Sequence, residues 1–323
     1  MATLLDPLIV KGLPFENRLV LPPMQTSLAT SQGEVTENLI NYYVQRSTGP
    51  GLIIVEHSYI TIQGRVSDKQ LGIYDDSLIQ GLETLSSQVH RTETPIVIQI
   101  NHAGQKTSAE VTGFQPVAPS PTRSARELTV DELAILVDQY VAATERAIKA
   151  GFDGVEVHGA HGFLLNQFYS PLTNHRKDSY GGSLENQMRL PLEIVRKVRQ
   201  ILGNRLLLYR LGAVDRESNG IQIDDSQLFA RKLVDAGVDI IDVSGGLCGS
   251  RPPQLDTTQG FFIPQAHAIK RSVDIPVIGV GGIRDPEYAN RLLREDTIDL
   301  VAVGRPMLND ANWATHFLNK LRI

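Results

Sequence analysis

Short apolar segments alternate with amphipathic segments along the whole chain, and this alternation limits the fold more than any other feature. Segments such as 96–98, 276–278 and 300–303 contain mainly Ile, Val and Leu, which is typical of strands buried on both faces of a parallel sheet. The clearest helix follows Thr129, a good N-cap, and ends at Gly151. The number of strand–helix pairs predicts a (β/α)8 barrel, and no glycine-rich dinucleotide motif opens the first helix.

The expected elements can be assigned along the sequence. We expect strands at 17–21, 52–55, 95–100, 152–157, 205–211, 239–243, 275–280 and 298–303, and helices at 36–47, 77–91, 130–150, 185–201, 226–236, 264–271, from 286 onwards and at 309–321. Long connections at 101–126, 158–182 and 244–261 follow predicted strands, and loops of that length usually carry function. The prediction is therefore a single barrel domain, 1–323, with long βα loops at the C-terminal face.

The composition argues against several classes of protein. Of the 323 residues, 41% are hydrophobic and 21% charged, which is enough apolar material for a large core. A net charge of −5 gives no reason to expect a nucleic-acid or membrane partner. The one cysteine, Cys248, cannot form an internal disulfide or a cysteine-based metal cluster. We see neither a secretory signal nor a membrane span of about 18 apolar residues, so the cytoplasm is the default location.

Two histidines, His158 and His161, follow the predicted strand 152–157. At the mouth of a barrel strand, two imidazole N–H groups can hold one carbonyl oxygen. A carbonyl held in this way withdraws electrons from a conjugated carbon, which then accepts hydride. The pair therefore indicates redox chemistry on an electron-poor alkene.

The same histidines have two alternative interpretations. A zinc ion would need further ligands, and the nearest candidates, His175 and Asp178, have a spacing that matches no common zinc motif. A purely structural role for the pair is the other alternative. We expect no metal.

Glycines follow the last two predicted strands, at Gly281, Gly282 and Gly304, and the last is followed by Arg305. Barrels of this kind often bind phosphate at this place, because bare backbone N–H groups can approach its oxygens. Tight strand-to-helix turns would explain the same glycines.

Polar side chains end two further strands, Gln99 on the third and Arg210 on the fifth. An inward Gln offers a donor and an acceptor to the edge of a heterocycle such as a flavin, although it could also be a satisfied polar residue at the barrel rim. A buried guanidinium needs an anionic partner, which could be a reduced flavin or an internal carboxylate such as Glu156.

Taken in order, these residues resemble the motifs of the Old Yellow Enzyme family of FMN-dependent ene-reductases, most closely its short, thermophilic-like bacterial branch. The resemblance extends over nearly the whole chain. The matching runs are 17–18, 22–24, 51–56, 99–106, 158–162, Asn166, 174–182 and 304–305.

The resemblance implies FMN bound without a covalent link over the barrel mouth, and NADH or NADPH as the reductant. Hydride would pass from the flavin to the β-carbon of an electron-poor alkene, whose carbonyl or nitro oxygen would be bound by His158 and His161. The residues implied in FMN binding are Pro22, Pro23, Met24, Gln25 and His57 along the flavin, Gln99 at its pyrimidine edge, Arg210 near N1, and Gly281, Gly282, Gly304 and Arg305 at the phosphate.

Three positions depart from the family pattern. Phe163 stands where the family usually has a proton-donating Tyr, so water or another side chain, such as Tyr169 or His57, would protonate the α-carbon. Gln25 stands where this branch often has a Cys that tunes the flavin, and either Gln25 or Thr26 could bond near the ring. His57 occupies a position that is usually small, where it could act as an acid or point away.

We therefore expect an FMN-dependent NAD(P)H oxidoreductase that reduces α,β-unsaturated carbonyl compounds. With Phe163 present, the first alternative is an enzyme that oxidises saturated ketones or amines, or that reduces flavins, nitro compounds or quinones. A phosphate-binding isomerase or lyase without flavin, and a non-catalytic flavin-binding barrel, are further alternatives. The sequence leaves open the substrate, the choice between NADH and NADPH, and whether the protein forms a homo-oligomer.

Overall fold

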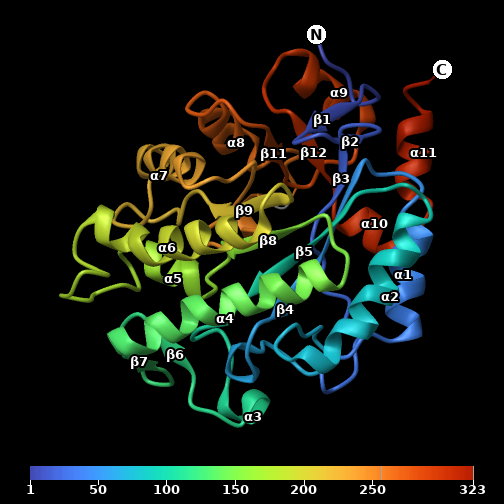
Figure 1. Ribbon diagram of the computed structural model, residues 1–323. Coiled ribbons are helices and arrows are strands. Elements are labelled where there is room, and N and C mark those ends of the chain that lie inside the picture. The colour runs from blue at the N-terminus through green and yellow to red at the C-terminus, as the bar shows by residue number, and fades with distance from the viewer. Residues whose placement is uncertain (256, 323) are drawn as a thin grey trace.

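The computed structural model describes residues 1–255 and 257–322. Within these ranges, parallel strands close into a barrel in the order β10-β11-β12-β3-β4-β5-β8-β9, and helices surround it (Figure 1). The predicted (β/α)8 barrel is confirmed. Asp256, in the loop 244–261, and Ile323, at the end of the expected domain, lie outside the described residues.

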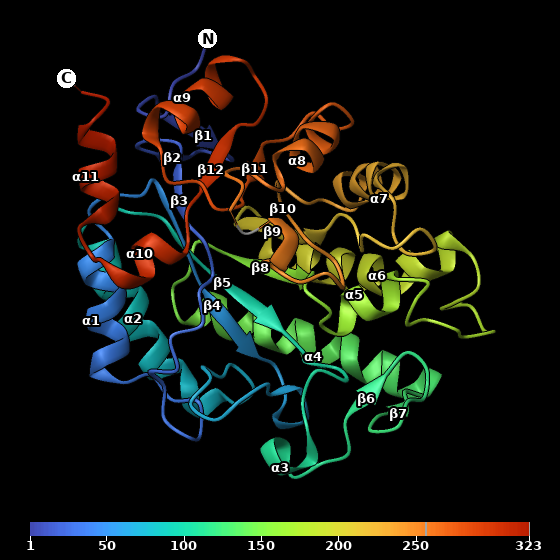
Figure 2. The same ribbon diagram turned by 180° about the vertical axis from the view of Figure 1, so that it is seen from behind.

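The barrel strands begin and end close to the positions expected. They are β3 (Leu19–Leu21), β4 (Leu52–Tyr59), β5 (Ile96–Asn101), β8 (Gly154–Gly159), β9 (Leu206–Gly212), β10 (Ile240–Ser244), β11 (Val277–Gly279) and β12 (Leu300–Ala302). Seen from behind, β12 lies beside β3, so the last strand of the chain closes onto the first barrel strand (Figure 2).

The surrounding helices follow the strands in the expected alternation. They are α1 (Glu37–Arg46), α2 (Ile79–His90), α4 (Val130–Lys149), α6 (Leu184–Leu202), α7 (Ile223–Asp235), α8 (Ile263–Lys270), α9 (Pro286–Arg294) and α11 (Trp313–Asn319). Smaller elements are β1 (Leu8–Val10), β2 (Leu13–Phe15), α3 (Ala109–Thr112), β6 (Val117–Ala118), β7 (Arg126–Glu127), α5 (Leu164–Tyr169) and α10 (Arg305–Asn309). No helix in the described ranges is long and apolar enough to cross a membrane.

Two expectations about helices were wrong. The last helix does not run over 309–321, because the chain leaves α10 at Asp310, whose carboxylate accepts a hydrogen bond from the backbone N–H of Asn312 at 2.9 Å. Such a local bond competes with helix continuation. In the loop 158–182, helix α5 was missed because all its residues are buried, so its sequence shows no amphipathic period.

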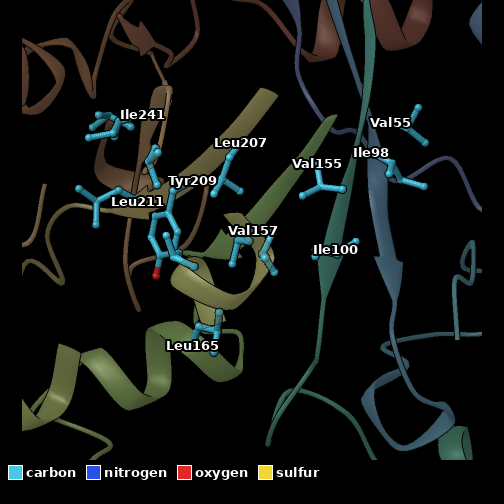
Figure 3. Packing of buried hydrophobic residues seen from close by; sticks show 14 of the residues in the cluster. Val55, Ile98, Ile100, Val155, Val157, Leu165, Leu207, Tyr209, Leu211 and Ile241 are labelled. Atoms are coloured by element: carbon cyan, nitrogen blue, oxygen red, sulfur yellow. The ribbon is translucent and has the colours of Figure 1, made fainter. Parts of the chain in front are cut away.

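Side chains that point outward from the barrel strands form the layer between barrel and helices. Successive residues of a strand face opposite sides, so every second residue belongs to this layer. Figure 3 shows it at β4, β5, β8, β9 and β10, with Val155 and Val157 of one strand lying near Leu207 and Tyr209 of the next. The layer fixes the surrounding helices to the barrel.

Side chains that point inward form a separate apolar cluster at the N-terminal half of the barrel. The β1–β2 hairpin contributes Phe15, which is fully buried, and Val10 to this cluster. The strand members are Val20, Leu52, Ile54, Val97, Leu206, Leu208, Ile240, Ile278, Leu300 and Ala302. The barrel interior is thus filled with packed side chains at this end, and any cavity must lie at the other end.

The Phe15→Ala variant tests whether the hairpin is an essential part of this interior. Removing a fully buried phenyl ring is expected to lower the free energy of unfolding by about 3–5 kcal/mol, because the site cannot collapse completely. Phe114 is 52% exposed, so Phe114→Ala should change the free energy of unfolding by less than about 0.5 kcal/mol. Denaturant titrations followed by circular dichroism measure both, and equal losses would contradict the packing role.

Candidate active site

A cavity of about 850 Å³ lies where the C-terminal ends of the barrel strands meet the long loops. Its volume lies within the range of about 300–1,000 Å³ that is common for small-molecule and cofactor sites. The candidate residues from the sequence that line it are Pro22, Pro23, Met24, Gln25, His57, Gln99, His158, His161, Phe163, Arg210, Gly281, Gly282, Gly304 and Arg305. The fold therefore brings nearly every candidate to one cavity.

Tyr169, which the sequence offered as one candidate proton donor, is the exception, because it does not line the cavity. Its side chain is fully buried on α5 and packs on Phe229 of α7, with ring centroids 4.6 Å apart. Its hydroxyl shares a hydrogen bond of 3.1 Å with Ser226 Oγ. Helix α5 turns this residue toward the helical layer, away from the cavity wall.

His158 and His161 lie side by side at the end of β8, with ring centroids 5.1 Å apart. His158 is the last inward residue of the strand, and its Nδ1 atom is buried without a hydrogen-bond partner among the described residues. His161 has a positive φ of 58°, and its Nε2 lies 2.7 Å from Ser244 Oγ of β10. Two imidazoles from one strand end thus converge on the same part of the cavity.

Both imidazoles are held in the neutral form. Burial lowers the pKa of His158 well below its usual value, and the neighbouring His161, His57, Arg210 and Lys106 lower it further. Burial likewise lowers the pKa of His161, followed by the effect of Arg210. A neutral imidazole has one N–H to donate, so each ring can give one hydrogen bond to a ligand oxygen.

The tautomer of His57 follows from its contact with Gln70. The Oε1 atom of Gln70 accepts a bond from the backbone N–H of Val66 at 2.7 Å, so its Nε2 faces His57. Because Gln70 Nε2 donates to His57 Nδ1 at 2.8 Å, the imidazole proton is assigned to Nε2. Burial lowers the pKa of His57 to about 4, with a further decrease from Lys106.

A layer of buried polar groups lies directly below the cavity. Arg210 Nη1 pairs with Asp242 Oδ2 at 2.9 Å, and Gln99 Nε2 donates to Glu156 Oε1 at 2.7 Å. Burial raises the pKa of Glu156 well above its usual value, and nearby Asp242 raises it further. The sequence left open a reduced flavin or an internal carboxylate, such as Glu156, as the partner of Arg210, and the internal carboxylate that pairs with it is Asp242.

Glycines at the ends of β11 and β12 line the opposite side of the cavity. Gly281 has a φ of 129° and Gly282 a φ of 64°, which L side chains rarely adopt. A Cβ atom at Gly304 would lie 2.5 Å from Met24 Sδ. The turns themselves thus require glycine, and they also leave backbone close to the cavity beside Arg284 and Arg305.

Sequence reasoning missed several lining or supporting residues, among them Arg284, Asp242, Ser244 and Lys106. Asp242 and Ser244 are inward residues of β10, and a charged residue in an apolar strand was an available signal. Lys106 lines the cavity from the loop after β5, with Nζ 4.7 Å from the Phe163 ring centroid. Lys106 belongs to the matching run 99–106, but the run gave it no role, because its position depends on how that loop packs on the loop after β8.

The zinc alternative finds no support in the geometry. His175 is exposed, and Asp178 pairs with Arg176 at 2.6 Å. Across residues 1–255 and 257–322, no group of three or more His, Cys, Asp or Glu side chains is arranged to hold a metal ion.

Comparison with known proteins identifies the family. Residues 3–322 match the NADH:flavin oxidoreductase / NADH oxidase family. The chain is 41% identical over 317 residues to an NADH oxidase of Thermoanaerobacter brockii, covering 94% of this chain and 49% of that protein, so it spans about half of that relative. It is 37% identical over 315 residues to an NADPH dehydrogenase of Bacillus licheniformis, covering 96% of this chain and 92% of that protein.

A solved structure agrees with this match. The old yellow enzyme homologue of Zymomonas mobilis superposes with a TM-score of 0.87 at 28% identity, over 99% of this chain and 93% of that one. The chain therefore belongs to the NADH:flavin oxidoreductase / NADH oxidase family, the family of Old Yellow Enzyme. It is an FMN-dependent oxidoreductase with a nicotinamide reductant.

The cavity is chemically suited to FMN. Arg210 Nε is buried at the cavity floor without a hydrogen-bond partner among the described residues, which fits an anionic or acceptor edge of a cofactor. Arg284 and Arg305 line the glycine side, where a phosphate would require positive charge. Polar groups are thus available at both ends of one elongated ligand.

The low pKa of His57 predicts a measurable loss of stability in acid. Its pKa is about 4 in the folded protein and about 6.5 when unfolded, so the unfolded state binds the proton first as the pH falls. As the pH falls from 7 to 5, His57 should therefore lower the free energy of unfolding by about 2 kcal/mol. Urea titrations of His57→Asn, which keeps an acceptor near Nδ1, should show a pH dependence weaker by about that amount.

The control for this prediction is His316→Asn, because the His316 side chain is exposed. It should leave the pH dependence of the wild-type protein unchanged. An identical pH dependence in His57→Asn and wild type would contradict the assignment of His57 as a buried neutral imidazole.

Proposed function

We propose that the protein reduces the C=C bond of α,β-unsaturated carbonyl compounds with NADH or NADPH through FMN. The observation that carries the proposal is the pair His158 and His161 at the cavity wall, two imidazoles whose ring centroids lie 5.1 Å apart. Their N–H groups can hold one carbonyl oxygen without transferring a full proton to it. Negative charge that develops on this oxygen is then stabilised where it forms.

The residues proposed to hold FMN are those lining the rest of the cavity. Gln25, Gln99, His57 and Arg210 would contact the ring system together with Pro22, Pro23 and Met24, and Gly281, Gly282, Gly304 and Arg305 would hold the phosphate. When bound, FMN supplies hydride acceptance from the nicotinamide and hydride delivery to the β-carbon. The Arg210 guanidinium stabilises negative charge at the cavity floor.

Phe163 favours a second candidate function. Its ring lies 4.8 Å from that of His158, and 5.3 Å from that of His57, so it forms part of the substrate wall but carries no acidic proton. Acceptors that need no proton on carbon, such as quinones or nitro compounds, avoid this limitation. His158 and His161 would bind the oxygens of these acceptors in the same way.

An anaerobic absorbance experiment tests both functions. The purified protein is reduced with NADH or NADPH and then mixed with cyclohexenone. Flavin bands that bleach and return with the enone support alkene reduction. Bands that return only with a quinone or a nitro compound contradict it and favour the second function.

The Phe163→Tyr variant tests whether the missing hydroxyl limits the reaction. A phenol at this position can protonate the α-carbon. Reoxidation by cyclohexenone, measured by stopped flow, should therefore be at least about tenfold faster than in the wild type, which is less than a general acid usually contributes. Reoxidation by a quinone forms no C–H bond and serves as the control with an unchanged rate. Equal rates with the enone would show that proton transfer from this position is not limiting.

A further inference from the structure

The proton that completes alkene reduction has to come from a group near the histidine pair. The α-carbon of the substrate is bonded to the carbonyl carbon, so it lies close to the oxygen that His158 and His161 would hold. In this chain the wall beside them is Phe163, which has no proton to give. The cavity must therefore offer another acid, or leave the step to water.

The other candidates are poor acids. His57 is neutral at pH 7 and carries only its Nε2 proton, which an imidazole does not readily release. Tyr169 does not reach the cavity. Among the described lining residues, Arg, Ser and Thr are far weaker acids than an ammonium, and Tyr, Cys, Asp and Glu are not present.

We infer that Lys106 is the proton donor to the α-carbon, an inference that rests on the proposed alkene reduction. Its Nζ atom lies 4.7 Å from the centroid of the Phe163 ring and 2.7 Å from the backbone oxygen of His161. The ammonium is thus held between the Phe163 ring and the loop that carries His161. It lines the same cavity as both histidines.

The surroundings of Lys106 suit this role. It forms no ion pair with a carboxylate in the part of the chain that is described, so its charge can act on a substrate. Partial burial lowers the pKa of Lys106 below its usual value, which makes the ammonium a stronger acid. The residue is still exposed at the cavity mouth, where water can return the proton.

The step balances without a further reactant. Hydride addition to the β-carbon leaves an enolate, with its oxygen held by His158 and His161. The electron pair of the enolate then forms the new C–H bond at the α-carbon while an N–H bond of Lys106 breaks. Lys106 is left as a neutral amine, which solvent reprotonates before the next turnover.

Substitutions at Lys106 separate acid catalysis from charge or structure. Lys106→Met removes the proton, and Lys106→Arg keeps the charge and a donor for the His161 oxygen but cannot act as an acid near neutral pH. Both should slow reoxidation of the reduced enzyme by cyclohexenone by about 100-fold. Reduction by NADH and reoxidation by a quinone should stay near wild-type rates. Lys149→Met, at an exposed lysine, is the matched control.

A double variant gives the sharpest test. If Lys106 supplies the proton, Phe163→Tyr should restore most of the rate lost in Lys106→Met, because the phenol replaces the missing acid. A structural role for Lys106 predicts no such rescue, and it predicts near-normal rates for Lys106→Arg. Either of those results would overturn the inference.

The acidity of Lys106 can be measured apart from turnover. After reductive methylation with ¹³C-formaldehyde, the resonance that is missing from Lys106→Met should titrate at lower pH than the other lysine resonances. Titration together with them would count against the inference. Wild-type protein that is not reoxidised by the enone would overturn the proposed function itself, whereas equal enone rates in wild type and both Lys106 variants would overturn only the role of Lys106.

Discussion

The strict alternation of side chains along the barrel strands is the constraint on which the rest of the structure depends. Each strand places every second residue inside the barrel. At the N-terminal half these residues are apolar and pack around Phe15, which closes that end. At the C-terminal half the same inward face carries polar side chains. These are Gln99, Glu156, Arg210 and Asp242, and they form a polar floor of the cavity above the apolar cluster.

This polar floor determines the electrostatics of the cavity. A buried guanidinium is stable only beside a counter-charge, and Asp242 supplies it at 2.9 Å on the adjacent strand. Glu156 lies on the neighbouring strand β8, where burial and then the nearby Asp242 raise its pKa, so its charged form is disfavoured below the cavity. Burial lowers the pKa values of His158 and His161, and the positive charges of Arg210 and Lys106 lower them further. Such a site favours oxygen ligands that become negative during reaction.

Much of the candidate site could be predicted because it lies at strand ends. Gln99, His158 and Arg210 end apolar segments, and in a parallel barrel all strands end at the same face. Tyr169 was misplaced because six buried residues of α5 show no amphipathic pattern, so the sequence could not say which way its ring points. Lys106 was overlooked as a functional group because its role depends on a contact with the loop after β8, 55 residues away.

The sequence alone determined the barrel, its strand ends and the family, because periodicity, turn residues and motif order are local properties of the chain. Only the tertiary structure decided which charges meet and in which state they are held. Arg210 pairs with Asp242 on a strand that follows it by a whole helix, and the tautomer of His57 depends on Gln70, 13 residues away. Burial then sets the pKa values, and burial is a property of the packed molecule that no single segment contains.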